Sequence, residues 1–148
     1  MNHEQINNRQ RWLSTLAKSP EQALLHHWSG LKLDIPYEWV RPPEVGSVMV
    51  QGRTGSSGNA FNLGEVTVTR CSLKLSDGTV GHGYHQGRNK AAAQVVALCD
   101  ALLQQGNERI EHEVVQVLHQ AQHDHMDLIR RKAAATKVDF FTLVRGDD

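Results

Sequence analysis

An Asp-Gly pair at positions 77 and 78 places the strongest constraint on how this chain folds. Asp-Gly is a preferred pair for the two-residue turn that joins antiparallel strands, because both residues tolerate the left-handed backbone that the turn needs. Residues 61–76 before it form the longest strand-like stretch, and residues 79–86 after it return as the partner strand. The sequence therefore predicts a central antiparallel hairpin, to which shorter stretches at 37–41 and 47–52 add further strands.

The apolar positions of the first hairpin strand change face partway along. Val66 and Val68 occupy even positions, whereas Cys71 and Leu73 occupy odd ones, with Arg70 between the two sets. A regular strand keeps one face toward the core, so this change predicts a β-bulge near Arg70 or a half that is buried on both faces.

Helical patterns flank the strands. The first 31 residues carry two apolar stripes at helical spacing, separated by Ser19-Pro20-Glu21, which predicts an antiparallel pair of helices. Asn89 is typical of a helix cap and Gly106 of a helix end. The buried face of the helix between them is predicted to consist of Ala92, Val95, Val96, Cys99, Leu102 and Leu103.

A second long helix is predicted from Asn107 onward. About 28 residues is long for one helix, so a break near residues 122–124 is considered. The apolar stripe of this helix is predicted to consist of Ile110, Val114, Val117, Leu118 and Ala121.

Helices, then antiparallel strands, then helices predict an α+β fold. We expect a single domain over residues 1–148, with an antiparallel sheet of about four strands and with an N-terminal helix pair and C-terminal helices packed on it. Residues 138–145 form a β-type run without a turn that leads back. This run either returns to the sheet or is offered to another chain as an added strand.

Charge and cysteine content narrow the functional classes. The formal net charge is zero, which argues against a protein that coats nucleic acid. Basic groups prevail in residues 41–90 and acidic groups in residues 100–127, a distribution that favours a specific partner or ligand. We expect a cytoplasmic protein, because there is no signal peptide or membrane span in the sequence and its cysteines, Cys71 and Cys99, form no disulfide framework.

The best local candidate for a ligand site is a predicted phosphate-binding turn made of Gln86, Gly87, Arg88 and Lys90. A strand ends there, a glycine lets the backbone approach a ligand, and a helix begins whose N–H groups favour an anion. The alternative is an ordinary glycine turn with an Asn89 cap and two solvated cations. A second glycine-rich loop, residues 53–58, is more simply a hairpin connection than a phosphate loop.

No set of residues predicts catalysis or a metal site on this chain. His119 and His123 have helical i, i+4 spacing, but such a cluster is more often a polar helix face than a zinc site. Cys71 and Cys99 fall at positions predicted to be buried, where a thiol is usually inert. We therefore expect no catalytic residues, no metal and no cofactor here.

The end of the chain is unusually apolar. Phe140, Phe141 and Leu143, followed by Arg145, are predicted to form a partner interface, because a strand with large apolar groups on both faces is either central in a sheet or buried against another protein.

Several stretches together are similar to one known family. These are Arg11-Trp12, residues 64–70 (Gly-Glu-Val-Thr-Val-Thr-Arg), Asp77-Gly78-Thr79, residues 86–90 (Gln-Gly-Arg-Asn-Lys) and residues 138–146 (Val-Asp-Phe-Phe-Thr-Leu-Val-Arg-Gly). In order and spacing the chain resembles the PhnG family over nearly its whole length. It departs from the family pattern at Asn89, where family members carry Asp.

The resemblance implies a subunit of the bacterial carbon–phosphorus lyase core complex, which acts in phosphonate catabolism. Such a subunit is needed with PhnH, PhnI and PhnL to form α-D-ribose 1-methylphosphonate 5-triphosphate from ATP and methylphosphonate. The chain would then be part of a transferase complex without supplying its catalytic residues. PhnI is implied as the direct partner, with PhnH and PhnJ in the core and PhnK and PhnL associated.

Two alternatives stay open beside a purely structural subunit. Arg88 and Lys90 of such a subunit could hold a phosphate of the substrate directly. The chain could also be a stand-alone nucleotide- or phosphate-binding module, a reading that its zero net charge disfavours.

Overall fold

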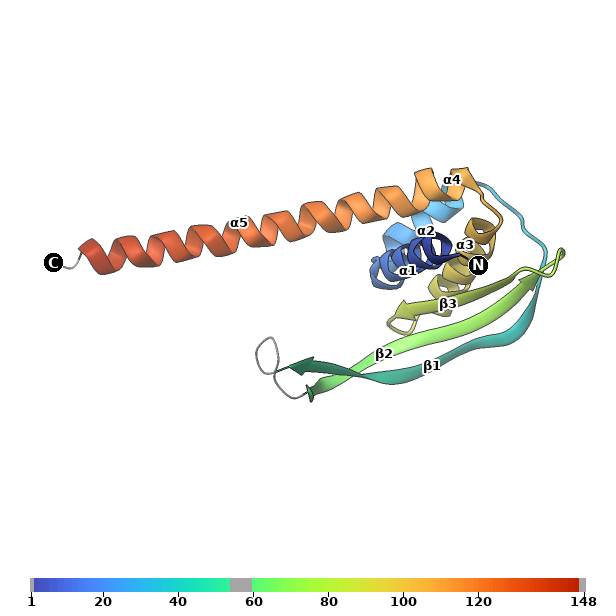
Figure 1. The fold of residues 1–148 in the computed structure, drawn as a ribbon, viewed down its shortest axis with the longest axis horizontal. Helices are drawn as coiled ribbons and strands as arrows, with labels where there is room; N and C mark the ends of the chain where they lie inside the picture. Colours follow the sequence, from blue (N-terminus) through green and yellow to red (C-terminus); the bar gives the residue numbers. More distant parts are fainter. Residues whose placement is uncertain (1, 54–59, 147–148) are drawn as a thin grey trace.

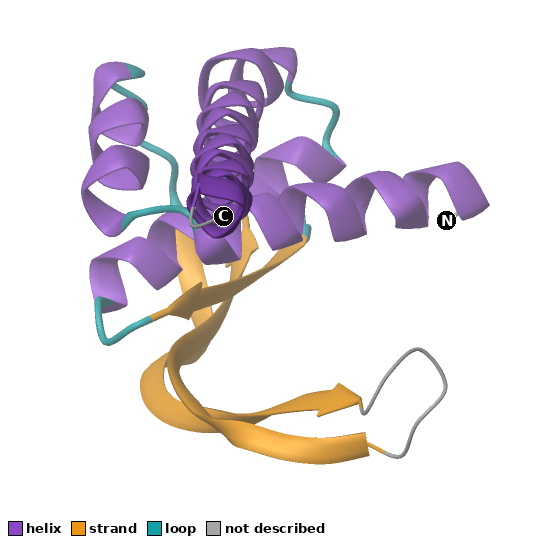
Figure 2. Cartoon of the chain, turned by 90° about the vertical axis from the view of Figure 1, so that its left-hand side faces the viewer, coloured by secondary structure: helices purple, strands orange, loops and turns teal. Residues whose placement is uncertain are grey.

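The computed structural model describes the backbone of residues 2–53 and 60–146 and the side chains of residues 2–51 and 64–137. Helices lie on one face of a strongly curved antiparallel sheet (Figures 1 and 2). In chain order the elements are α1 (His3–Lys18), α2 (Glu21–Gly30), β1 (Tyr37–Arg53), β2 (Ala60–Leu75), β3 (Val80–Gln86), α3 (Lys90–Gln104), α4 (Glu108–Ile110), the π-helical turn η1 (Glu111–Val115) and α5 (Gln116–Gly146). The predicted α+β class is confirmed.

The central hairpin forms where the Asp-Gly pair predicts it. β2 and β3 are joined by a tight turn in which the Leu75 N–H donates to the Thr79 carbonyl at 2.9 Å. Gly78 has φ +91°, a conformation that favours glycine. The Asp77 carboxylate accepts from the Thr79 N–H at 3.0 Å, and this bond is the main cause of the lowered pKa of Asp77.

The described sheet has three strands in the order β1-β2-β3, so the expectation of about four is wrong. The stretches at 37–41 and 47–52, expected as separate strands, belong to the single strand β1. Pro42 and Pro43 do not interrupt it, because β1 is an edge strand and an edge tolerates residues that lack an N–H donor.

The irregularity expected near Arg70 lies on the neighbouring strand. Arg41 pairs with Ser72 and Glu44 pairs with Arg70. Between these two pairs β1 advances by three residues and β2 by only two, so β1 has one extra residue. A second register shift lies between Trp39 and Arg41. β1 therefore carries bulges directly opposite the place where β2 changes its apolar face.

Residues 138–145 are helical, which contradicts the predicted strand. They continue α5, a single helix of 31 residues that also runs through residues 122–124 without the break considered from its length. Short runs of β-branched and aromatic residues do not separate strand from helix by themselves. Here the preceding segment has no Gly or Pro to end the helix, and the first such residue is Gly146.

The turn η1 explains where the predicted stripe of this helix is wrong. Ile110, Val114 and Leu118 are buried as expected, but Val117 is 41% exposed. A π-turn adds one residue to the helical repeat and rotates all later side chains around the axis. As a result Val115 is buried in place of Val117, and Ala121 faces solvent.

α3 is the centre of the molecule. It packs on β3 and β2 and on α1 and α2, and α1 also packs on β3, so the two N-terminal helices are held by α3 and the sheet more than by each other. The six residues predicted for its buried face are all buried, and Ala93, Ala97 and Ala101 are buried as well. These small side chains let the helix approach the sheet closely.

Two glycines of β3 make that approach possible. A β-carbon built on Gly81 would lie 2.0 Å from the Ala97 carbonyl oxygen, and one on Gly83 would lie 2.1 Å from the Ala93 carbonyl oxygen. The backbone of α3 therefore rests directly on β3, with no room for a side chain between them.

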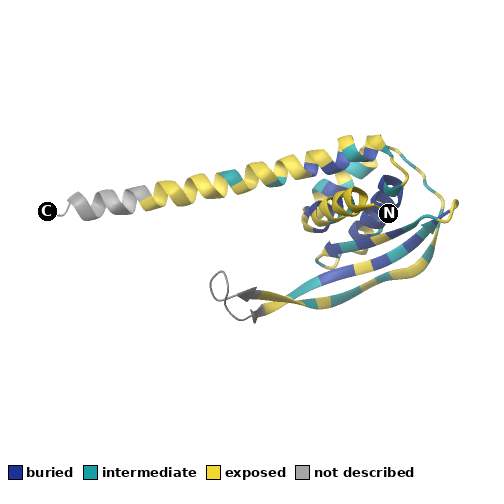
Figure 3. Cartoon of the chain, viewed as in Figure 1, coloured by how far each residue is buried: buried dark blue, intermediate teal, exposed yellow. Residues whose placement is uncertain are grey.

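Two elements project from this body on the same side (Figure 1). One is α5, about 46 Å long at 1.5 Å per residue. The other is the β ribbon, which we define as residues 47–53 of β1 with residues 60–67 of β2, beyond the last pairing with β3 at Val68. Figure 3 shows that the described part of α5 beyond its base is exposed at nearly every position, with Gln122 and Asp127 intermediate. Among the described residues, no helix is long and apolar enough to span a lipid bilayer.

Candidate functional site

One buried carboxylate ties the helices to the sheet. Asp100 of α3 is fully buried. Arg9 donates to both of its oxygens, from Nε at 3.1 Å and from Nη2 at 2.9 Å. Trp12 Nε1 donates at 3.0 Å, the His82 N–H at 2.9 Å and Gln104 Nε2 at 3.2 Å. The cluster thus joins α1, α3 and β3 around a single side chain.

The Asp100 cluster stabilises the fold, and its carboxylate oxygens are not free to bind a substrate or to accept a proton from one. Five donors occupy two oxygens, so the carboxylate is satisfied and has no open side for a substrate. The bonds to Asp100 are the main cause of the raised pKa of Arg9. Sequence reasoning missed this cluster. Its available signal is that Asp100 is the one acid in the apolar segment 91–103.

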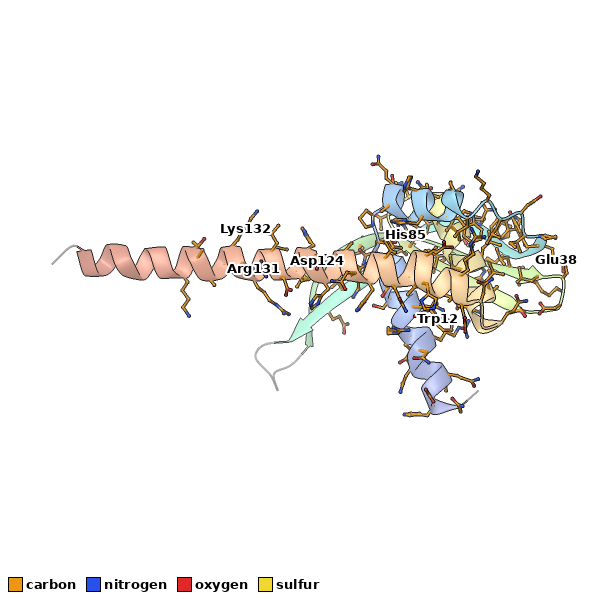
Figure 4. All side chains as sticks on the ribbon, turned by 90° about the horizontal axis from the view of Figure 1, so that it is seen from above. Trp12, Glu38, His85, Asp124, Arg131 and Lys132 are labelled. Atoms are coloured by element: carbon orange, nitrogen blue, oxygen red, sulfur yellow. The ribbon has the colours of Figure 1, made fainter. Side chains whose placement is uncertain are left out.

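The two histidines of β3, His82 and His85, lie three residues apart and face opposite sides of the sheet. His82 is exposed, and its Nδ1 lies 2.9 Å from Ser72 Oγ. His85 is buried, with Nε2 2.8 Å from the Ser19 carbonyl oxygen where α1 ends (Figure 4). A carbonyl only accepts, so Nε2 donates this bond, and Nδ1 has no partner among the described atoms. His85 therefore positions the connection between α1 and α2.

The predicted phosphate-binding turn has the expected backbone. Gln86 ends β3, Gly87 has φ +108°, and Asn89 caps α3. The side chain of Asn89 accepts the Ala92 N–H at 3.0 Å and so occupies one donor that an anion would otherwise use. Arg88 and Lys90 are exposed. A phosphate role for this turn stays a prediction.

The thiols of Cys71 and Cys99 are buried, as predicted. Cys71 Sγ donates to the Ala93 carbonyl at 3.3 Å, and burial raises the pKa of this thiol to about 11. Burial also raises the pKa of Cys99, and the neighbouring charge of Asp100 adds to the shift. Both groups are held as neutral thiols, which are poor nucleophiles.

We expect both thiols to resist Ellman's reagent at pH 8 until the protein is unfolded. Their raised pKa also couples stability to pH. The unfolded chain ionises its thiols near pH 9 while folded Cys71 holds its proton to about pH 11, so its contribution is complete below pH 9 and is lost as the pH rises through that interval. The loss is about 1.4 kcal/mol per pH unit for each thiol. Urea titrations at pH 8 to 11 measure it, and Cys71→Ala should show a shallower decline. Rapid labelling of the folded chain would contradict this account.

His119 and His123 lie one turn apart on an exposed face of α5. His123 lies 3.4 Å from Asp127 one turn along, and both are substantially exposed. Among the side chains that the structure describes, no three His, Cys, Asp or Glu groups converge on a point.

The predicted interface residues Phe140, Phe141, Leu143 and Arg145 lie in α5, and their side chains fall outside the described ones. Their backbone is helical, so they do not act as an added strand. An interface formed by them stays a prediction.

The fold thus defines a class of protein: a small α+β body with a saturated polar core and two long projecting elements that present much surface for its size. A family model described as "Phosphonate metabolism protein PhnG" matches residues 7–146. A curated relative from Rhizobium meliloti (strain 1021), the "Alpha-D-ribose 1-methylphosphonate 5-triphosphate synthase subunit PhnG", is 42% identical over 146 residues, which cover 97% of this chain and 92% of the relative. The chain belongs to the PhnG family, and the resemblance described from its motifs is confirmed.

Proposed function

We propose that this chain is a non-catalytic subunit of the synthase that forms α-D-ribose 1-methylphosphonate 5-triphosphate from ATP and methylphosphonate. The relative that is 42% identical is named as a subunit of that synthase. In this proposal the chain docks on PhnI, within a core that also contains PhnH and PhnJ and with which PhnK and PhnL associate. The bond-making groups lie on another subunit.

The observation that carries the proposal is the uncovered length of α5. None of the described side chains of residues 123–137 is buried. Met126, Leu128 and Ile129 are nevertheless apolar and are 46–48% exposed. Helices owe most of their stability to packing of an apolar face. A long helix with exposed apolar side chains therefore indicates that another protein packs against it.

The charges on α5 indicate what kind of partner surface it would contact. Beyond Ile129 the described part of α5 carries Arg130, Arg131, Lys132 and Lys137 and no carboxylate (Figure 4 labels two of the four). The basic end of α5 therefore suits a partner surface with an apolar strip and acidic groups beside it.

We expect the double substitution Leu128→Glu with Ile129→Glu to abolish co-purification with the other synthase subunits and to lower product formation in the co-expressed complex at least about tenfold, since buried apolar anchors dominate interfaces. The melting temperature of the isolated chain should change by less than about 2 °C, because neither side chain packs on the body. Co-expression with a tagged partner, followed by size-exclusion chromatography, measures assembly.

The matched control is Gln22→Glu with Ser29→Glu. It adds the same two charges at exposed positions of α2, and we expect assembly to be unchanged. Full assembly and full synthase activity with the α5 double variant would refute docking through this helix.

A further inference from the structure

The bare face of the sheet, opposite the helices, holds a pair of arginines that the fold brings together from different strands. Arg70 lies on β2 and Arg41 on β1. Arg41 pairs with Ser72, whose hydroxyl meets the exposed His82 ring on that same face. The bulges on both sides of Arg41 set this register, and without them Arg41 would share the helix-facing side with Tyr37 and Trp39.

The two arginines line one pocket. Its volume is about 220 Å³, and Glu44, Val45 and Gly46 complete its lining. A β-carbon built on Gly46 would lie 3.8 Å from Arg70 Nη2, so the Arg70 guanidinium extends over the glycine. The missing side chain at position 46 keeps the space in front of Arg70 open.

Neither guanidinium has a partner among the described side chains. Another basic residue on the same face is paired, since Lys74 Nζ forms an ion pair with Glu38 Oε1 at 2.9 Å. Glu44 lines the pocket but forms no ion pair with either arginine within 4.0 Å in the described structure. The pocket therefore combines two cations that keep their hydrogen-bond donors and one carboxylate, with a net positive charge.

We propose that this pocket binds a single phosphate or phosphonate group of the synthase substrates, an inference that rests on the proposed function. A tetrahedral oxyanion presents three oxygens, which two forked donors from different directions can share. A carboxylate is satisfied by one bidentate arginine. Pockets that enclose a whole drug-sized ligand measure about 300–1,000 Å³, so this one takes an end group whose remainder reaches another subunit.

The test measures binding to the full-length chain and kinetics of the co-expressed complex. Methylphosphonate and inorganic triphosphate are titrated separately at low salt and followed by phosphorus NMR. We expect Arg41→Gln and Arg70→Gln each to weaken binding about tenfold, as the loss of a charge-assisted hydrogen bond does. In the complex the same variants should raise KM for the substrate whose group is held.

Two further variants separate a pocket from diffuse charge. Gly46→Val keeps both arginines and the net charge but fills the space beside Arg70, and it should weaken binding comparably. A branched residue suits a strand, so the fold should persist. Lys18→Gln removes one exposed positive charge from α1 and should leave binding unchanged.

The outcomes are distinct from those of the subunit proposal. Loss of triphosphate binding assigns the pocket to the nucleotide, and loss of methylphosphonate binding assigns it to the phosphonate; both support the inference. It is overturned if the Arg41→Gln, Arg70→Gln double variant retains wild-type binding and KM. It is also overturned if that variant keeps wild-type binding of methylphosphonate and triphosphate but fails to assemble, since the pocket would then hold a partner carboxylate. The subunit proposal fails separately, if the wild-type chain never assembles with the synthase.

Discussion

Asp100→Ala is expected to lower the free energy of unfolding by about 3–5 kcal/mol, because it breaks a buried ion pair. The substitution leaves the buried Trp12 indole N–H and the His82 N–H without an acceptor, and it leaves the partly buried Arg9 without its counter-charge. Domains of this size are stable by about 5–15 kcal/mol, so much of the variant should be unfolded at moderate temperature. Urea titration monitored by circular dichroism measures the change.

The control is Asp124→Ala on α5. Asp124 is exposed and, among the described side chains, accepts only from Gln120 of its own helix, at 2.9 Å, so its loss should cost less than about 0.5 kcal/mol. A variant Asp100→Asn keeps the shape and one acceptor and should fall between the two. An Asp100→Ala protein within 1 kcal/mol of wild type would show that the cluster does not hold the helices on the sheet.

Gly83→Ala is expected to cost about 3 kcal/mol, at the upper end for overpacking. The added methyl would lie 2.1 Å from the Ala93 carbonyl oxygen and 2.6 Å from Cys71 Sγ. The first of these atoms belongs to helix backbone, so it moves only if α3 lifts from the sheet. Combining Gly83→Ala with Gly81→Ala should prevent folding, because two successive turns of α3 are then displaced.

Gly30→Ala is the matched control for these glycine variants. Gly30 ends α2, and no atom lies within 4 Å of a β-carbon built there. We expect a stability change within about 0.5 kcal/mol or a small gain, because alanine favours the helix. If Gly83→Ala unfolds at the same urea concentration as wild type, the close approach of α3 to β3 is not required.

Local signals account for the parts of the fold that sequence reasoning predicted correctly. The Asp77-Gly78 turn and the Asn89 cap act within a few residues, and the structure forms both. The incorrect predictions concern elements whose structure depends on contacts with distant parts of the chain. β1 passes through Pro42-Pro43 because it is an edge strand, and position in a sheet is not encoded in a short stretch.

The C-terminal helix shows the second kind of error. Residues 138–145 have strand-like composition, yet they continue a helix that begins at Gln116. Local propensity is a weak prior when the preceding turns are already helical, because extending a helix is easier than starting a new element.

For the candidate site, too, local features could be predicted from the sequence, and contacts between distant segments could not. The position of Arg70 in the middle of a strand is visible in the sequence, and so is the Gln86–Lys90 turn. Arg41 belongs beside Arg70 only because bulges shift the register of β1, and Asp100 is shared by α1 and β3 only in the folded chain. Each of these groups is defined by pairing across distant segments.

Hydrogen–deuterium exchange of the chain, alone and within the co-expressed synthase complex, tests the subunit account most directly. The account predicts that residues 123–137 of α5 exchange rapidly in the isolated chain, because none of their described side chains is buried, and become strongly protected after assembly. α3, which is already buried, should be protected in both states. Equal exchange of residues 123–137 in the free chain and in an intact complex would contradict it.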